Sequence, residues 1–438
     1  MARSDRIVRQ GWSGADEVFG FERLPVFPFA VLMIFCLCVP AIGVVALLLQ
    51  IAAFGAILAI YWRRLPAMLL AALPFVLLPV FATLSALWSD VPMISLRYGV
   101  QLFLTVLMGV ALARVLDLRQ LVLAIFIGVS LACLLGLASG RTGLSEDGAV
   151  LIGLAGSKNQ FSYFALFWLG SALCVLASAK YRLPARVMAA LALVPAAFVL
   201  VQGSSMTAII SAAVMAAMLA LLALAHWLGR GGRMFALAAA GLLTVPVLVA
   251  LPQIEAEANR FRSDVLGKDS RLTGRTLLWE AADSLIRQQP GIGHGYKAIW
   301  LGPQGKGLLA RNGQSDGRAF HFHDTFRELQ ADLGMVGLLL FLGPFGFVLL
   351  RSILLLIARV DAPRAFAFVT LLTILLRVRT ELVIGPFLTE TVVLYAVLAA
   401  LIALPLGSPD RAHGRERTGV LRPRPSPRTR SRPERKPA

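Results

Sequence analysis

Residues 66–88 have the sequence PAMLLAALPFVLLPVFATLSALW, and no side chain among them is charged. A run of about 20 apolar residues is long enough to cross the hydrocarbon core of a bilayer as an α-helix. A helix also pairs its own backbone polar groups, which a lipid environment demands. Comparable runs recur along most of the chain, so the sequence predicts an all-α, polytopic membrane protein.

The composition of the whole chain agrees with this class. Of its 438 residues, 58% are hydrophobic and 15% are charged, whereas soluble domains have about 45–50% apolar and about 25% charged residues. The apolar runs do not alternate every second residue, as the strands of an outer-membrane barrel would. The four cysteines lie within apolar runs, which predicts small core residues and not a disulfide or zinc framework.

The apolar runs predict about twelve transmembrane helices. The first two belong to one run that breaks at Pro40. The predicted helices cover residues 26–40, 42–61, 66–88, 98–116, 121–139, 160–179, 187–203, 206–228, 234–252, 334–357, 365–377 and 387–405. The chain should therefore divide into a cytoplasmic segment (1–24), helices one to nine (25–252), a large, partly helical periplasmic loop (253–333), helices ten to twelve (334–405) and a disordered basic cytoplasmic tail (406–438).

The charges of the loops predict how the helices are oriented, because Lys and Arg are enriched in short cytoplasmic loops. One set of alternate loops holds most of the basic residues, and the opposite short loops hold few. The basic set comprises Arg63, Arg64, Arg114, Arg119, Lys180, Arg182, Arg186, Arg230, Arg233, Arg359 and Arg364. This bias predicts a multi-pass inner-membrane protein with both termini in the cytoplasm.

The tail beyond Ser408 contributes much of the net charge of +18, because it is rich in arginine. It also has several prolines and few apolar residues, so it cannot bury enough surface to fold alone. We expect it to lie against anionic lipid headgroups. Binding to nucleic acid lacks the interleaved aromatic residues that would support it, and no nucleic-acid partner is predicted.

Residues 253–333 form the one long loop predicted on the periplasmic side. Loops of this length usually serve a function. Within the loop, residues 274–289 have the pattern of an amphipathic helix that ends at Pro290. The apolar stripe of that helix consists of Leu278, Ala282, Leu285 and Ile286.

Basic residues also gather on the predicted periplasmic side, against the general charge bias. Arginine binds phosphate through paired hydrogen bonds and keeps its charge, so an anionic ligand at the outer leaflet would explain them. A solvated loop surface also explains scattered arginines. Arg97, Arg377 and Arg379 are the stronger candidates because they adjoin helices, where a charge is costly.

A second candidate site is His-Phe-His-Asp-Thr-Phe-Arg-Glu-Leu at residues 321–329. His323 could serve as a general acid or base, since histidine titrates near neutral pH. A metal site from His321 and His323, with His294 as a further candidate ligand, is an alternative, although the spacing is not that of a helical ligand pair. A structural cap at the start of the next helix is the third interpretation. Asp324 and Glu328 lie four residues apart, on one helical face.

A third candidate is Gly-Leu-Ala-Gly-Ser-Lys-Asn-Gln at residues 153–160, just before the sixth predicted helix. Small residues that expose backbone amides at a helix N-terminus favour an anion, and Lys158 adds positive charge. The residue order is not that of a P-loop.

Four motifs occur in a fixed order along the chain. They are Gly-Ser-Lys-Asn at 156–159, Ser-Ser-Met-Thr at 204–207, Gly-Arg-Thr-Leu-Leu-Trp at 274–279 with Pro-Gly-Ile-Gly-His-Gly at 290–295, and His-Asp-Thr-Phe at 323–326 with Gly-Met-Val-Gly at 334–337. This order resembles the O-antigen ligase and O-antigen polymerase superfamily. Asp324 stands where the family usually has asparagine, and Met206 where ligases often carry arginine. The sequence is therefore more similar to the exopolysaccharide polymerase branch.

The resemblance implies glycosyl transfer at the periplasmic face. The donor would be a glycan on undecaprenyl diphosphate, and the acceptor a sugar hydroxyl on another lipid-linked glycan or on lipid A core. The family needs neither a cofactor nor a metal. Fixed cations would instead stabilise the departing diphosphate, and Arg97 and Arg275 are the expected residues, with Lys158 in support.

The resemblance also suggests roles for the remaining candidates. His323 would deprotonate the attacking hydroxyl or orient the donor. The residues expected to bind substrate are Lys158, Asn159, Arg377, Arg379, Asp324 and Glu328. The long loop would close over the site and exclude water.

Other functions remain open from the sequence alone. A true O-antigen ligase would use the same donor with lipid A core as its acceptor. A transporter would place ionisable residues at mid-membrane depth, where this chain has almost none. An assembly protein of a secretion complex is a further alternative. The expected partners are membrane lipids, the lipid-linked donor, the acceptor and a chain-length regulator.

Overall fold

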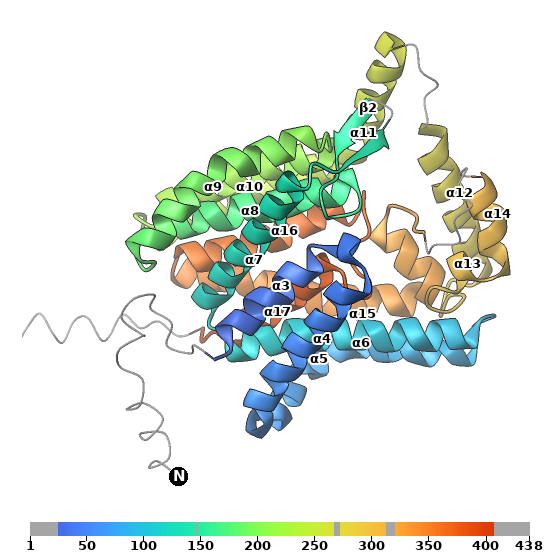
Figure 1. The fold of residues 1–438 in the computed structure, drawn as a ribbon, viewed down its shortest axis with the longest axis horizontal. Helices are drawn as coiled ribbons and strands as arrows, with labels where there is room; N and C mark the ends of the chain where they lie inside the picture. Colours follow the sequence, from blue (N-terminus) through green and yellow to red (C-terminus); the bar gives the residue numbers. More distant parts are fainter. Residues whose placement is uncertain (1–24, 146–147, 267–271, 312–319, 407–438) are drawn as a thin grey trace, which may run out of the picture. The chain divides into compact units, whose positions relative to one another are not determined.

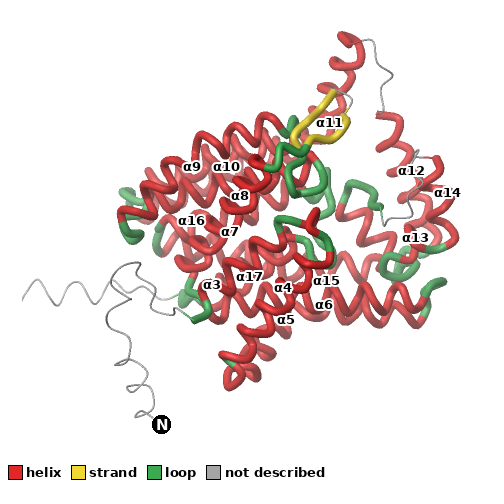
Figure 2. Tube along the Cα trace, viewed as in Figure 1, coloured by secondary structure: helices red, strands yellow, loops and turns green. Residues whose placement is uncertain are grey.

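A computed structural model describes residues 25–145, 148–266, 272–311 and 320–406, and these residues are almost entirely helical (Figures 1 and 2). The chain divides into two units, Met1–Pro405 and Leu406–Ala438. The first unit holds every helix and strand described below.

Helices occur at all twelve ranges that the apolar runs predict. They are α3 (Phe27–Leu37), α4 (Val44–Ile60), α5 (Leu65–Leu84), α6 (Pro92–Val115), α7 (Leu118–Ala138), α8 (Lys158–Ala177), α9 (Leu183–Gln202), α10 (Met206–Ala225), α11 (Arg230–Leu266), α15 (Thr325–Ala358), α16 (Ala362–Arg377) and α17 (Thr389–Ala403). Among the described residues, 7 helices are long and apolar enough to cross a membrane, and α3, α4 and α17 are shorter apolar helices. The chain is a polytopic helical protein, and twelve crossings stay a prediction.

The centre of the helical unit is α17, which packs against α6, α15 and α16. Nearly all its residues from Thr389 to Leu401 are buried. A close approach to α6 is possible because Gly109 has no side chain: a Cβ there would lie 2.6 Å from the carbonyl oxygen of Val392. Small residues at such contacts are typical of helices that pack in lipid.

The outer surface of the helical unit is apolar, as a lipid environment requires. On α5, Leu69, Leu73 and Leu77 are all exposed. Their spacing of four residues puts them on one face of the helix, away from the buried Met68, Ala72 and Phe75.

Hydrogen bonds join the loops of the basic set to one another. Arg119 donates to the carbonyl oxygen of Lys180 over 3.0 Å, and the Lys180 ammonium lies 3.9 Å from the Asp361 carboxylate. The His226 ring lies 2.9 Å from the carbonyl oxygen of Val360. These loops therefore share one end of the helical unit, in agreement with the grouping that the charge bias predicts.

The loops assigned to the opposite side are joined in the same way. The backbone N–H of Ala41 donates to the carbonyl oxygen of Leu154 over 3.1 Å. The Trp88 indole donates to the carbonyl oxygen of Gly293 over 3.1 Å. The loops that these contacts join agree with the predicted grouping, while the compartment that each end faces stays a prediction.

The long loop contains α12 (Leu272–Gln288), α13 (Ala298–Leu301) and α14 (Pro303–Arg311). The predicted amphipathic stripe is confirmed, because Leu278, Ala282 and Leu285 are buried in a second apolar core with Trp300 and Phe322. In Figure 1 this small helical group lies beside α15, which α12 and α13 both contact.

Three details differ from the sequence prediction. A hairpin of β1 (Thr142–Ser145) and β2 (Gly148–Leu151) precedes α8, so the chain is not purely α-helical. Positive φ at Gly140 and Gly148 lets the chain turn there. In addition, α11 continues beyond residue 252, and α15 begins at Thr325 and not at residue 334. Asp324 caps α15 by accepting from the N–H groups of Phe326 and Arg327.

Candidate active site

One cluster of polar side chains joins three segments that are far apart in the sequence. Asn159, at the start of α8, donates to Glu381 Oε1 over 2.7 Å. His323, just before α15, places Nδ1 3.4 Å from Glu381 Oε2. The Glu381 carboxylate, in the loop between α16 and α17, therefore bridges the two predicted motifs. Glu381 is not among the site residues that the sequence predicts.

Thr325 holds the histidine segment against the loop that carries Glu381. Its backbone N–H donates to the carbonyl oxygen of Val378 over 2.7 Å. Its hydroxyl donates to the carbonyl oxygen of Glu381 over 2.7 Å and accepts from the N–H of Val383 over 3.0 Å. His323 has φ +52, a left-handed conformation that a non-glycine residue adopts only when its surroundings impose it. The position of His323 is thus strongly determined.

Asp324 is buried and is paired with protein groups on several sides. It caps α15, and its Oδ2 lies 2.9 Å from Arg327 Nη1 and 3.7 Å from Arg379 Nε. This arrangement favours the structural-cap interpretation for Asp324. It also brings the predicted Arg379 to the edge of the cluster.

Arg327 and Trp279 hold α12 against the histidine segment. Arg327 Nε lies 2.8 Å from Asp283 Oδ1, and its guanidinium lies over the Trp279 ring, 5.0 Å from the centroid. The Trp279 indole donates to the carbonyl oxygen of Phe322 over 3.0 Å. The motif that contains Arg275 therefore adjoins the cluster, although the Arg275 side chain lies outside the described part of the structure.

Arg377 accepts from the N–H of Glu381 through its backbone carbonyl oxygen, and it is only 2% exposed. Its guanidinium lies over the Tyr163 ring, 3.6 Å from the centroid. Among the described residues, its Nε and Nη1 have no hydrogen-bond partner. Buried polar groups are normally paired, so these nitrogens are suited to an anion or to water. The Arg379 side chain, in contrast to that of Arg377, is accessible to solvent, since 41% of it is exposed.

Lys158 is the first residue of α8 and is half-buried. The preceding Ser157 caps the helix by accepting from the N–H of Gln160 over 3.2 Å. Lys158 thus stands at the positive end of α8, and an anion site there stays a prediction.

Glu328 does not line the cluster, because it takes part in a buried ion pair. Its Oε1 lies 2.6 Å from Lys297 Nζ, and its Oε2 accepts from the N–H of Phe322 over 2.9 Å. Burial works to lower the pKa of the Lys297 ammonium, but Glu328 and Asp332 outweigh it, so that pKa is raised. This pair anchors the long loop to α15.

The glycine-rich turn at 291–295 packs against the same part of α15. The N–H groups of His294 and Gly295 donate to the carbonyl oxygens of Ala331 and Asp332. The His294 ring contacts the carbonyl oxygen of Leu285, 3.0 Å away. His294 is therefore part of this anchor and not a third ligand beside His321 and His323.

Arg97 lies apart from these contacts on α6. Its side chain is exposed, and its guanidinium lies 5.7 Å from the centroid of its neighbour Tyr98. No contact between Arg97 and the cluster is found in the part of the chain that the structure describes.

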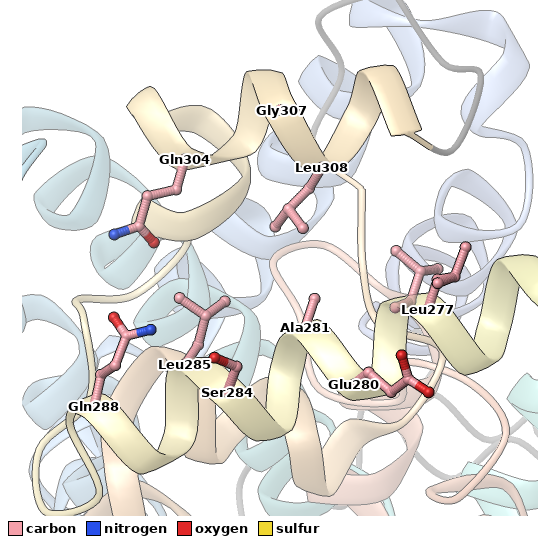
Figure 3. Close-up of a pocket in the computed structure, with 10 residues that line it drawn as sticks. Leu277, Glu280, Ala281, Ser284, Leu285, Gln288, Gln304, Gly307 and Leu308 are labelled. Atoms are coloured by element: carbon pink, nitrogen blue, oxygen red, sulfur yellow. The ribbon is translucent and has the colours of Figure 1, made fainter.

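A groove of about 670 Å³ separates α12 from α14 (Figure 3). Leu277, Ser284 and Gln288 line it from α12, with Gln304 and Leu308 opposite them. Helical spacing puts the groove on the opposite face of α12 from Trp279 and Asp283. The groove and the cluster are thus separate features.

Comparison with known proteins supports the similarity that the motif order suggests. A family model described as O-Antigen ligase matches residues 191–342. The exopolysaccharide production protein ExoQ of Rhizobium meliloti (strain 1021) is 30% identical over 271 residues, which is 60% of this chain and 60% of that relative. The resemblance to the O-antigen ligase and polymerase superfamily is therefore confirmed.

Proposed function

We propose that this membrane protein is a polysaccharide polymerase that transfers a glycan from undecaprenyl diphosphate to a sugar hydroxyl. The O-antigen ligase family match and the similarity to an exopolysaccharide production protein support glycan transfer as the general activity. The observation that carries the proposal is the convergence of His323, Glu381 and Asn159 beside Arg377 and Arg379.

The reaction needs a base for the acceptor hydroxyl. In the proposal, the acceptor oxygen attacks the anomeric carbon of the donor, and the bond between that carbon and the phosphate oxygen breaks. The hydroxyl proton passes to His323 Nε2, because Nδ1 faces the Glu381 carboxylate at 3.4 Å. A carboxylate in this position stabilises the imidazolium that forms. Such contacts are often long before substrate binds and tighten afterwards.

The leaving group is a lipid diphosphate, whose negative charge grows as the bond breaks. Arg379, Arg377 and Lys158 are proposed to stabilise this charge. Arg379 contacts Asp324 beside His323, Arg377 accepts a backbone hydrogen bond from Glu381, and Lys158 adjoins Asn159. Arg275 is proposed to join them from α12. Arg97 stays in the proposal as a contact for the lipid-linked donor at the membrane boundary. Fixed positive charges of this kind replace a metal ion, so the transfer itself is proposed to be metal-independent.

The cluster is proposed to face the periplasm, with both termini in the cytoplasm of the inner membrane. Lipid-linked glycans are then reached from the outer leaflet, and α12 to α14 cover the site. The groove between α12 and α14 does not enter this mechanism. A chain-length regulator is the proposed protein partner.

The proposal is tested with purified protein, lipid-linked glycan and acceptor. We expect His323→Ala to lower turnover by about 10²–10⁴-fold, the usual effect of losing a general base, without lowering the amount of folded protein. His226→Ala is the matched control, because that exposed ring contacts a backbone carbonyl at the opposite end of the helical unit. Equal turnover by the His323→Ala variant and the unchanged protein would refute the proposal.

O-antigen ligation is the second candidate, since the matching family model carries that description. Expression in two bacterial strains separates the candidates. Restored long chains on lipid A core in a ligase-null strain would indicate a ligase, and restored polymer length in a polymerase-null strain would indicate a polymerase. A transporter or assembly protein would give no product with purified components.

A further inference from the structure

We propose that His321, His323 and Glu381 form a site for a divalent transition-metal ion of the zinc class, and that the bound ion blocks transfer. One ligand atom from each residue can be chosen so that all three lie within 4.8 Å of one another. That separation suits three ligands around one ion. The binding proposal stands on this geometry alone, and the inhibition rests on the proposed function.

The two imidazole rings lie side by side in the segment that leads into α15. Residues 321–323 are not helical, and the chain turns at His323, which has φ +52. Phe322, between them, is fully buried and lies 4.7 Å from the centroid of the Trp300 ring. The centroids of the two imidazole rings are 4.1 Å apart. The apolar core therefore fixes the segment with both rings directed at the loop that carries Glu381.

Hydrogen bonds bear on how the three residues would bind the ion. His321 Nδ1 accepts from the N–H of His323 over 3.1 Å, which leaves the proton of the neutral ring on Nε2. Binding of the ion to the His321 ring would therefore replace this hydrogen bond. Asn159 donates to Glu381 Oε1, which orients Oε2 toward His323. Partners that orient the ligands in this way are typical of metal sites.

The donor set predicts the kind of ion. Two imidazoles and one carboxylate with an open fourth position form a known zinc arrangement. Magnesium and calcium ions prefer oxygen ligands, so a site with two nitrogen donors does not suit them. Occupation by zinc would engage His323 and Glu381, the two groups that the proposed transfer uses. The ion would thus be an inhibitor and not a cofactor.

The test measures binding without relying on activity. The whole protein, freed of metal with a chelator and placed in lipid nanodiscs, is titrated with Co²⁺ while the visible absorption of the bound ion is recorded. We expect one ion per chain, displaced by Zn²⁺. In His321→Asn the amide oxygen can still accept from the N–H of His323, but the imidazole ligand is gone. Binding should weaken by at least about tenfold.

Two controls complete the binding measurement. Glu381→Gln should weaken binding as well, whereas Glu280→Gln, an exposed glutamate on α12, should not. Equal Co²⁺ binding by the unchanged protein and His321→Asn would overturn the proposed site, as would the absence of binding at 100-fold excess of the ion. Either result leaves the transfer proposal standing.

Inhibition is measured separately, as the turnover of lipid-linked glycan at increasing Zn²⁺. We expect turnover of the unchanged protein to fall as the site fills, and turnover of His321→Asn to fall only at a Zn²⁺ concentration at least about tenfold higher. If Zn²⁺ binds and turnover persists, the blocking role is wrong. If no variant and no condition gives turnover, the proposed function fails, while the Co²⁺ titration still decides the site.

Discussion

Glu381 contacts Asn159 and His323, one residue from each of two predicted motifs. In the proposed reaction its negative charge stabilises the imidazolium of His323. In Glu381→Gln the amide oxygen can still accept from Asn159, but the negative charge beside His323 is lost. Without it the imidazolium is less stable. We expect turnover to fall by about 10²-fold, at the low end of the effects of a general base. The measurement is turnover per folded protein.

Glu280→Gln is the matched control for this variant, because that glutamate is exposed and lines the groove between α12 and α14. It should keep normal turnover. If Glu381→Gln also keeps normal turnover, His323 does not depend on a neighbouring carboxylate, and that part of the mechanism is wrong.

Arg379 and Arg359 form a natural pair for testing phosphate binding. Each places Nε near an aspartate, Arg379 at 3.7 Å from Asp324 and Arg359 at 3.9 Å from Asp361, and their side chains are 41% and 48% exposed. They lie at opposite ends of α16. We expect Arg379→Ala to raise the KM for the lipid-linked donor about tenfold, because a charge-assisted contact contributes about 1.5 kcal/mol or more. Arg359→Ala should leave KM unchanged, and a similar rise in both variants would contradict the prediction.

The sequence predicted several of these residues but not their partners. His323, Arg379 and Asn159 stand in recognisable motifs or at helix ends. Glu381 lies 222 residues from Asn159, and their contact depends on how the loop after α16 folds. One signal in the sequence could have indicated Glu381 as a site residue. It is an acidic residue that follows two arginines at a predicted helix end, where an ionisable group is costly unless it is paired.

At the scale of elements, apolar length predicted where helices form but not where they end. The start of α15 depends on Asp324 as an N-cap, which is a local hydrogen-bond effect and leaves the apolar pattern unchanged. The same helix breaks its regular geometry at Gly334, which has φ +64. There the turn after α12 packs into the break, with the N–H of Met335 donating to the carbonyl oxygen of Pro290 over 2.8 Å.

Gly334 should therefore be intolerant of any side chain. A Cβ at Gly334 would overlap the carbonyl group of Gly291, and a non-glycine residue with φ +64 and ψ −166 by itself costs about 1–3 kcal/mol. We expect Gly334→Ala to lower the Tm of the purified protein by several degrees and to reduce turnover, because the anchor of the long loop shifts.

Gly346→Ala in the same helix is the control. A Cβ at Gly346 would have nothing within 4 Å, and alanine is the better helix former by about 0.5–1 kcal/mol. Its Tm should be unchanged or higher. An equal loss of Tm in both variants would mean that α15 tolerates no substitution and that the break at Gly334 has no special role.

At the scale of the whole molecule, the charge bias agrees with the contacts found between several loops, because each short loop carries its own signal. The structure joins the basic loops through contacts such as that between Lys180 and Asp361, and it joins Trp88 to Gly293 at the other end. The cluster could not be predicted in the same way, since it depends on how three separate segments meet. The contacts alone do not distinguish inside from outside, so the compartment must be measured.

Two glycines allow that measurement with little change to the protein. Gly307 on α14 and Gly231 on α11 are exposed, and a Cβ at either would have nothing within 4 Å. The native cysteines, Cys36, Cys38, Cys133 and Cys174, are all buried, so they should give little background labelling. We expect a membrane-impermeant maleimide added to spheroplasts to label Gly307→Cys and not Gly231→Cys.

After the cells are broken open, both cysteines should react, which shows that each is accessible from its own side. The opposite pattern in intact spheroplasts would place the long loop in the cytoplasm. His323 adjoins that loop through the Trp279 contact, so it would then face the cytoplasm as well. A glycan presented on the outer leaflet could not reach it, and the polymerase and the ligase proposals would both fail for the same reason.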